Sequence, residues 1–337
     1  MRLLVLGGTA FLGRTVAEIA LAAGHEVTCA ARGVSGRVPE GAGFVPVDRD
    51  LPDGLAALAG HRFDALVDVA TRPSHVRRAV EAFAGRVAHA AFVSSGSVYA
   101  DQATPGQRAS SAPVVPAAPP EVDDPSADDH AAYGPCKVAA EEAVRAGFGK
   151  DRTFVCRAGL IIGPGDTSGR FGYWVSRLAR GGDVLAPGEP DEPVQYVDVR
   201  DLAAWLVLAA EARLTGVFDG IGAPVPREHF LTHVAAGVGA PVAFHWVDQD
   251  FLLEQGVRPW MGERSLPMWL PLPRYAGFLS RDVSASLAAG LHTRDVAHTA
   301  RDTLAWLGSS PVLDEPAPGL PESEETALLT AWRTETA

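Results

Sequence analysis

Tyr133 and Lys137 are the first residues whose types and spacing can do chemistry, because they stand four positions apart in the stretch YGPCK. On an α-helix, such residues share a face about one turn apart. A neighbouring ammonium favours the phenolate, so we expect Lys137 to lower the pKa of Tyr133 from its usual value of about 10. Tyr133 is therefore a candidate general acid in carbonyl reduction, or a base in the reverse direction. Pro135 fits only the first turn of a helix, which predicts a helix that begins near Tyr133.

A group of serines follows a short apolar run in the stretch FVSSGSVY, at Ser94, Ser95 and Ser97. In a parallel sheet, the carboxyl ends of the strands form the crevice in which ligands bind. A serine at that edge can donate a hydrogen bond to a substrate oxygen as negative charge develops on it. Taken alone, these would be ordinary turn serines. Their combination with Tyr133, Lys137 and a glycine-rich turn favours a catalytic role.

The glycine-rich turn is in the opening stretch MRLLVLGGTAFLG, where a short apolar run precedes a helical pattern. Such a turn points backbone N–H groups and a helix N-terminus at a pyrophosphate, which predicts a dinucleotide site. Ala10 stands where a middle glycine is expected, so its methyl either lengthens the approach or faces away. A purely structural turn is the alternative. The predicted contacts are Gly7, Gly8, Thr9, Ala10, Phe11, Leu12 and Gly13.

The end of the second apolar run bears on which dinucleotide binds. NAD selectivity usually rests on an acidic residue there, but the stretch TCAARG has none. Arg32 can pair with a ribose 2′-phosphate, which favours NADP(H) over NAD(H), and a solvated arginine is the alternative. Asp48 is a candidate acceptor for the adenine amino group or an N-cap. Val69 and Ala70, with Lys137, complete the predicted cofactor contacts.

The elements that must position these residues alternate along the first half of the chain. Apolar runs at 3–6, 25–30, 44–47, 65–69 and 91–93 are predicted strands, and 11–23 is a predicted helix that Gly24 ends. This order predicts an α/β fold of the Rossmann type, with a doubly wound parallel sheet. Runs at 153–155 and 194–197 are predicted as later strands of the same sheet.

The composition is that of an ordinary soluble globular protein, with 337 residues, 47% hydrophobic and 21% charged. A net charge of −12 disfavours a nucleic-acid partner. No apolar stretch approaches the length of a membrane span. Cys29, Cys136 and Cys156 form no CxxC motif and no histidine cluster. We therefore expect free thiols, no metal, no membrane partner and a cytoplasmic location.

The stretches GGTAFLG, FVSSGSVY, YGPCK, CRAGLIIGPGD and VQYVDVRDLA occur in this order. Together they resemble the extended short-chain dehydrogenase/reductase superfamily, which includes NAD-dependent epimerases and dehydratases, over about residues 1–310. The GGTxFLG opening, GHEVT and ARG are similar to an actinobacterial reductase-like branch. The resemblance implies a triad of Ser95, Tyr133 and Lys137, with Lys137 also on the nicotinamide ribose. It also implies a possible homodimer through the helix that contains YGPCK.

Departures from the family pattern narrow the expected activity. Dehydratases carry an acidic pair directly after the catalytic hydroxyl residue, whereas Gly96 and Ser97 follow Ser95 here. Sugar epimerases usually carry an asparagine where this chain has Leu160. We therefore expect an NAD(P)H-dependent reductase or dehydrogenase of a small metabolite. An NAD(P)-dependent epimerase of a sugar-like substrate and a non-catalytic cofactor- or RNA-binding scaffold are the alternatives.

The resemblance also predicts a division of the chain. Residues 1–165, with 195–222 returning to them, form the expected NAD(P)-binding domain. Residues 166–194 and 223–310 form the expected substrate-binding lobe, and 311–337 a linker with a helix at 322–333 capped by Ser323. A proline-rich loop at 103–129 is a candidate cover for the site. The predicted substrate contacts are Ser97, Arg170, Tyr173, Trp174 and Gln195.

Overall fold

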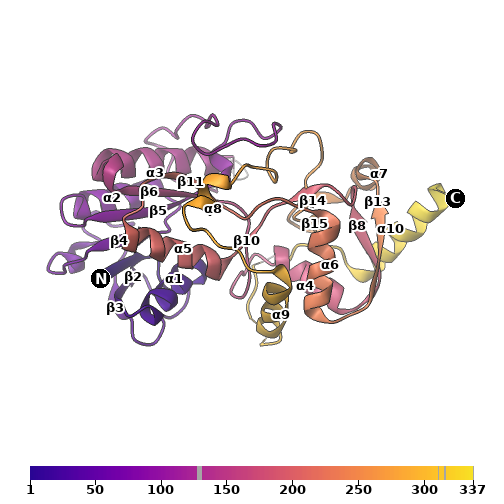
Figure 1. Ribbon diagram of the computed structural model, residues 1–337, viewed down its shortest axis with the longest axis horizontal. Helices are drawn as coiled ribbons and strands as arrows, with labels where there is room; N and C mark the ends of the chain where they lie inside the picture. The colour runs from indigo at the N-terminus through magenta and orange to yellow at the C-terminus, as the bar shows by residue number, and fades with distance from the viewer. Residues whose placement is uncertain (127–130, 310, 315, 337) are drawn as a thin grey trace.

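The computed structural model describes residues 1–126, 131–309, 311–314 and 316–336. Within these residues, seven parallel strands form one sheet, shown in the half of the molecule that carries the N-terminus in Figure 1. In spatial order, the strands are β11 (Gly216–Gly220), β6 (Thr153–Ala158), β5 (His89–Ser95), β4 (Ala65–Asp68), β1 (Arg2–Leu6), β2 (Glu26–Ala31) and β3 (Gly43–Pro46). The predicted Rossmann-type α/β fold is confirmed.

Helices cover both faces of this sheet because successive strand residues point to opposite sides. Leu3 and Val5 of β1 pack with α1 (Phe11–Ala22) and α5 (Val199–Ala212). Leu4 and Leu6 face the other way, towards α2 (Pro73–Phe83) and α3 (Tyr133–Phe148). Helix α3 begins at Tyr133, as Pro135 predicts. The short turns are η1 (Ala56–Leu58), η2 (Gly96–Val98) and η3 (Lys150–Arg152).

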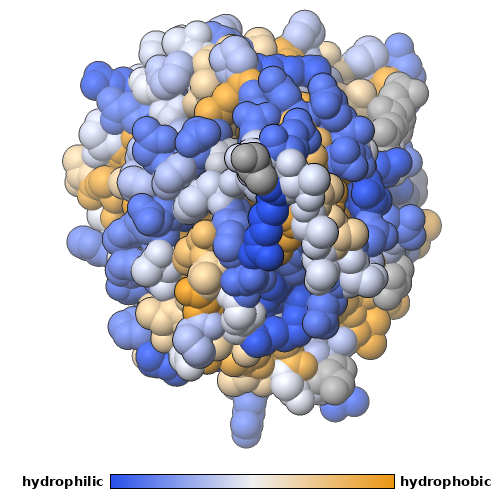
Figure 2. Space-filling view, turned by 90° about the vertical axis from the view of Figure 1, so that its right-hand side faces the viewer, coloured by the Kyte–Doolittle hydropathy of each residue, from blue (hydrophilic) through white to orange (hydrophobic). Residues whose placement is uncertain are grey.

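A second hydrophobic core lies in the part of the chain that follows β6, and Trp174, Phe171, Phe230 and Trp269 are its largest fully buried side chains. Its helices are α4 (Arg170–Ala179), α6 (Arg227–Val238), α7 (Gln249–Glu254), α9 (Val296–Leu307) and α10 (Glu322–Glu335). The pair β8 (Gly182–Pro187) and β13 (Val242–Val247) lies beside them. The remaining elements are α8 (Ser284–Ala288), β12 (Val225–Pro226), β14 (Arg258–Trp260) and β15 (Ser265–Pro267). Figure 2 shows this end of the molecule, where hydrophilic and hydrophobic residues are interspersed.

The prediction that 194–197 is a strand of the main sheet is wrong. The structure places two short strands there, β9 (Pro193–Val194) paired with β12 and β10 (Val197–Asp198) paired with β7 (Ile161–Ile162). The seventh strand of the main sheet is β11, which the sequence reading missed. Its sequence, GVFDG, contains two glycines and a buried aspartate, so it lacks the apolar run by which a strand is recognised.

The proline-rich segment is tied down as far as it is described, to residue 126. The backbone N–H of Val115 donates to Val98 at 2.8 Å, and that of Ala118 donates to Pro135 at 2.9 Å. The Ser74 hydroxyl donates to Asp123 at 2.6 Å. The segment therefore lies against η2 and the first turns of α2 and α3. Its predicted end, 127–129, lies outside the described residues, and its role as a cover stays a prediction.

The C-terminal helix packs on the second core instead of standing apart from it. Leu328 and Leu329 of α10 are buried in that core. Pro321 stands at the N-cap position and Ser323 is inside the helix, so the predicted Ser323 cap is wrong. The predicted domain limits stay a prediction, and the limits at 310 and 337 fall on residues outside those described.

Replacing Glu325 with alanine is expected to lower the free energy of unfolding by ~3 kcal/mol, measured by urea denaturation, because it leaves a buried arginine without its partner. Glu325 is buried, pairs with the buried Arg177 and accepts the backbone N–H of Leu185 at 3.0 Å. The matched control is Glu324→Ala, which removes an exposed ion pair to Arg264 and should cost less than ~1 kcal/mol. Equal losses in the two variants would contradict this account of how α10 is held.

Candidate active site

The turn between β1 and α1, together with the first turn of α1, contains three glycines at close contacts that a side chain would block. Gly7 has a φ of +98°, and a Cβ on it would lie 2.6 Å from Cγ2 of Val69. A Cβ on Gly8 would lie 2.5 Å from Sγ of Cys29. One on Gly13 would lie 2.2 Å from the carbonyl oxygen of Gly7, so only glycine lets α1 approach the turn this closely.

Ala10 occupies the N-cap position of α1 with φ −142° and ψ 153°, an extended conformation that any residue adopts. It is exposed, and no side chain caps the helix. The backbone N–H groups of Phe11, Leu12 and Gly13 have no partner within the helix, which fits a phosphate group bound at this end. Thr9 and Leu12 have buried side chains, so their backbone is the part of them that can reach a ligand.

A charged cluster lies beyond the ends of β2 and β3, on the side where the adenosine ribose of a dinucleotide would lie. Arg32 stands 3.5 Å from Asp50, which also pairs with Arg72 at 3.3 Å and with His75 at 2.8 Å. Arg32 is more than half exposed and so remains able to meet a ligand. Asp48 accepts the backbone N–H of Asp50 at 3.0 Å, so its carboxylate holds the turn after β3.

Lys137 is buried between the ends of β4 and β5. Its Nζ donates to the carbonyl oxygens of Ala70 at 2.7 Å and Val93 at 2.8 Å, which leaves one of its three donors available. Burial lowers the pKa of Lys137 to about 8, although the carboxylates of Asp68 and Glu141 act in the opposite direction. The carbonyl of Ala70, a predicted cofactor contact, therefore accepts a hydrogen bond from Lys137, a predicted catalytic residue.

Tyr133 and Ser95 meet at the carboxyl end of β5. Ser95 accepts the backbone N–H of Ser97 at 3.1 Å and lies 3.2 Å from its hydroxyl, so it fixes the turn η2. Burial raises the pKa of Tyr133, while a hydrogen bond with Ser95 and the nearby Arg170 guanidinium act to lower it. The expected lowering by Lys137 is wrong, because its ammonium is directed at two carbonyl oxygens and lies 6.0 Å from the centre of the tyrosine ring.

Arg170, at the start of α4, reaches the same place from the second core. Its Nε donates to Ser168 Oγ at 3.2 Å, and its guanidinium lies 5.2 Å from the centre of the Trp260 ring. Asp166, which the sequence reading did not single out, is buried beside Arg170, and its Oδ2 has no hydrogen-bond partner among the described residues. The GPGD stretch before α4 was the available signal, since an acid after a tight turn at a strand end faces the crevice.

Three other predicted substrate contacts, Gln195, Trp174 and Tyr173, have side chains that are bonded or packed within the protein. Gln195 is 0% exposed, and its amide donates to the carbonyls of Gly222 and Arg281 and accepts the backbone N–H of Arg281. Trp174 is 2% exposed and donates to a carbonyl oxygen of β15 at 2.7 Å. Tyr173 packs against Trp174, with ring centres 5.2 Å apart. Fully bonded or packed side chains offer no group to a substrate, so we leave these three out of the proposal below.

The remaining expectations concern metals, thiols and membranes. The three cysteines are free and buried, as predicted. The described residues contain no group of side chains that could hold a metal ion. Among the helices of the described part of the chain, none is both long enough and apolar enough to cross a membrane.

The parallel sheet, the glycine turn and the uncapped start of α1 define a Rossmann-type dinucleotide-binding protein. More particularly, the chain belongs to the NAD dependent epimerase/dehydratase family, whose model matches residues 3–218. The predicted resemblance is thereby confirmed, and a nicotinamide dinucleotide is the cofactor class of the family.

Three known proteins illustrate the similarity. The 2′-dehydrokanamycin reductase of Streptomyces kanamyceticus is 28% identical over 275 residues, covering 75% of this chain and 74% of the relative. A putative epimerase from Burkholderia cenocepacia J2315 superposes with a TM-score of 0.64 at 22% identity, covering 91% of this chain and 98% of the other. The Bordetella bronchiseptica enzyme WbmH, in complex with NAD+, superposes with a TM-score of 0.63 at 16% identity. The match covers 94% of this chain and 99% of the other. The two structures share the fold.

Proposed function

We propose that this chain is an NADP(H)-dependent reductase of a small ketone, with Ser95, Tyr133 and Lys137 as its catalytic residues. The observation that carries the proposal is the position of Tyr133, which begins α3 beside Ser95 at the carboxyl end of β5 and stands one helical turn from the buried Lys137. The glycine turn fits a dinucleotide, because its glycines let α1 lie close to the turn and no side chain caps the first N–H groups of α1.

The nicotinamide dinucleotide supplies the hydride when it is bound. Tyr133 enters the reduction as a neutral phenol, since burial raises its pKa, and gives its proton to the substrate oxygen as that oxygen gains negative charge. Ser95 donates a hydrogen bond to the same oxygen. Arg170 stabilises the phenolate left on Tyr133, and the free donor of Lys137 remains for the nicotinamide ribose.

Asp166 supports a substrate that carries hydrogen-bond donors next to the ketone. Its unpartnered, buried Oδ2 lies beside Arg170, and a substrate hydroxyl or ammonium would satisfy it. The similarity to 2′-dehydrokanamycin reductase supports reduction of a ketone of this kind. We therefore choose 2′-dehydrokanamycin as the first probe.

The test mixes the purified protein with NADPH and a panel of ketones headed by 2′-dehydrokanamycin, and follows NADPH absorbance together with product formation. Stoichiometric loss of NADPH with formation of an alcohol is the expected result. Reduction of none of the ketones would overturn the proposal.

An epimerase is the second candidate, favoured by the family to which the chain belongs. It uses the same residues but returns its cofactor oxidised, so product would form from a sugar-like substrate without net NADPH loss. A scaffold that binds cofactor or RNA would do neither, and the acidic net charge of −12 speaks against RNA. Homodimer formation and a cytoplasmic location stay predictions, the first testable by light scattering.

Replacing Arg32 with alanine is expected to weaken NADPH binding by about tenfold or more, because a guanidinium and a phosphate form strong charge-assisted hydrogen bonds. NADH lacks the 2′-phosphate and should keep its affinity to within about twofold. Fluorescence titration of both cofactors measures the effect, with the exposed Arg37→Ala as the control. Equal losses for the two cofactors would contradict the assignment of NADP(H).

A further inference from the structure

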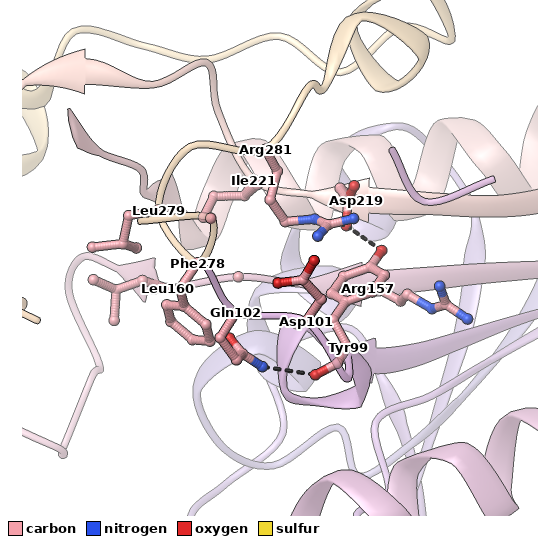
Figure 3. A pocket seen from close by; sticks show the side chains of 13 residues that line it. Tyr99, Asp101, Gln102, Arg157, Leu160, Asp219, Ile221, Phe278, Leu279 and Arg281 are labelled. Atoms are coloured by element: carbon pink, nitrogen blue, oxygen red, sulfur yellow. Dashed lines mark hydrogen bonds and ion pairs between the residues drawn. The ribbon is translucent and has the colours of Figure 1, made fainter. Parts of the chain in front are cut away.

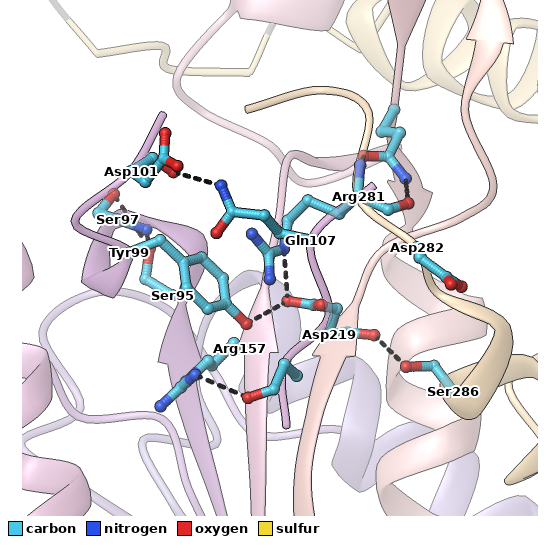
Figure 4. Close-up of polar contacts among 12 residues, drawn as sticks. Ser95, Ser97, Tyr99, Asp101, Gln107, Arg157, Asp219, Arg281, Asp282 and Ser286 are labelled. Atoms are coloured by element: carbon cyan, nitrogen blue, oxygen red, sulfur yellow. Dashed lines mark hydrogen bonds and ion pairs between the residues drawn. The ribbon is translucent and has the colours of Figure 1, made fainter. Parts of the chain in front are cut away.

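A buried charged cluster of Tyr99, Asp219 and Arg281 lies next to the serine-bearing turn η2 (Figure 4). The Tyr99 hydroxyl donates to Asp219 Oδ1 at 2.6 Å, and Arg281 Nε donates to the same oxygen at 3.0 Å. The Arg281 guanidinium lies 3.3 Å from the centre of the Tyr99 ring. One carboxylate oxygen therefore holds the phenol and the guanidinium stacked on each other.

The cluster joins three parts of the chain that are far apart in sequence. Tyr99 directly follows η2, Asp219 belongs to β11, and Arg281 comes from the segment before α8. The backbone of that segment is fixed as well, since Gly277 N–H donates to the Gln102 carbonyl at 2.9 Å. Figure 3 shows Arg281 reaching from this segment towards Asp219. The position of the Arg281 guanidinium is thus determined by both its backbone and its ion pair.

Tyr99 is joined to the turn that carries the serines both through its side chain, which packs with Val98, and through its backbone. Tyr99 N–H donates to the Gly96 carbonyl at 3.3 Å, and Ser95 Oγ accepts the N–H of Ser97 at the other end of η2. A cavity of about 20 Å³, the space of about one water molecule, adjoins the cluster and Gly96. Because the cluster is packed this closely, shortening Arg281 opens space into which the Tyr99 ring and the turn can move.

We propose that Arg281 and Asp219 are positioning residues for Ser95 and Ser97, acting through Tyr99. This rests on the proposed function, in which Ser95 holds the substrate oxygen. A segment of the chain beyond the sheet thereby sets the geometry of the catalytic serine, and the loss of Arg281 should lower kcat without weakening cofactor binding.

The test compares Arg281→Met and Tyr99→Phe with wild type. The second variant keeps the ring, removes one hydrogen bond and changes no buried charge, so it remains informative if Arg281→Met does not fold. Hydrogen exchange of the backbone amides at 96–99 is measured in the whole protein, together with NADPH affinity and with kcat and KM for a ketone that wild type reduces. We expect faster exchange at 96–99 in both variants. We also expect a kcat lowered about tenfold in Arg281→Met and an NADPH affinity unchanged to within about twofold.

Arg108→Met is the matched control. Arg108 also joins the segment after η2 to the segment before α8, through Asp282, but its own side chain is exposed. Amide exchange at 96–99 and kcat in this variant should equal those of wild type. Arg281→Lys, which restores a cation opposite Asp219, should recover part of kcat. Unchanged exchange and unchanged kcat in Arg281→Met, or equal effects in Arg108→Met, would overturn the proposal. If wild type reduces no ketone, the proposed function fails, and exchange at 96–99 still decides whether Arg281 holds the turn.

Discussion

Tyr133→Phe is expected to lower kcat for ketone reduction by about 10³-fold, because it removes one hydroxyl and with it the proton donor. The phenylalanine ring should occupy the place of the Tyr133 ring, because that ring is buried, as the raised pKa of its phenol reflects. NADPH affinity should therefore stay within about twofold of wild type. Stopped-flow measurement of NADPH oxidation under single-turnover conditions gives the rate of the hydride step directly.

The matched control for this variant is Tyr173→Phe, which removes a hydroxyl from a tyrosine that packs in the second core. It should retain nearly full activity. A Tyr133→Phe enzyme with wild-type kcat would remove Tyr133 from the mechanism. A loss that appears equally in NADPH affinity would indicate a structural role for the phenol instead of proton transfer.

The parts of the site that depend on local backbone geometry could be predicted from the sequence. The glycine turn and the start of α3 at Tyr133 follow from steric rules that act within a few residues, so spacing alone locates them. The order of strands and helices in the first half follows from the alternation of apolar runs with helical patterns. Later in the chain, the assignment of 194–197 to the main sheet is wrong. The strand β11 is not predicted there, because its glycines and its buried Asp219 hide the strand pattern.

The parts that depend on contacts between distant segments could not be predicted. Gln195 stands at the expected place in the chain, but its amide is bonded to Gly222 and Arg281, and no spacing rule announces those partners. Burial raises the pKa of Tyr133, and the sequence does not show that the Lys137 ammonium is directed away from the phenol. The carbonyl oxygens of Ala70 and Val93 hold the Lys137 ammonium away from the phenol, although Lys137 stands four residues after Tyr133 on the same helix.

Gly13→Ala is expected to weaken NADPH binding by about 100-fold, because its Cβ would lie 2.2 Å from the Gly7 carbonyl oxygen. Neither backbone can yield without moving α1 away from β1, and overpacking of this kind costs ~1–3 kcal/mol. Moving α1 also moves the N–H groups that face the pyrophosphate. Titration with NADPH measures the loss, and the circular dichroism of the variant shows whether the fold is kept.

Ala10→Gly is the informative partner of that variant, since it restores the glycine that the usual pattern contains. Ala10 is exposed and extended, a conformation that needs no glycine, so affinity for NADPH should change by no more than about threefold. A tenfold gain, by contrast, would mean that the methyl obstructs the pyrophosphate. Together the two variants distinguish Gly13, where the packing of α1 requires a glycine, from position 10, where the chain tolerates a side chain.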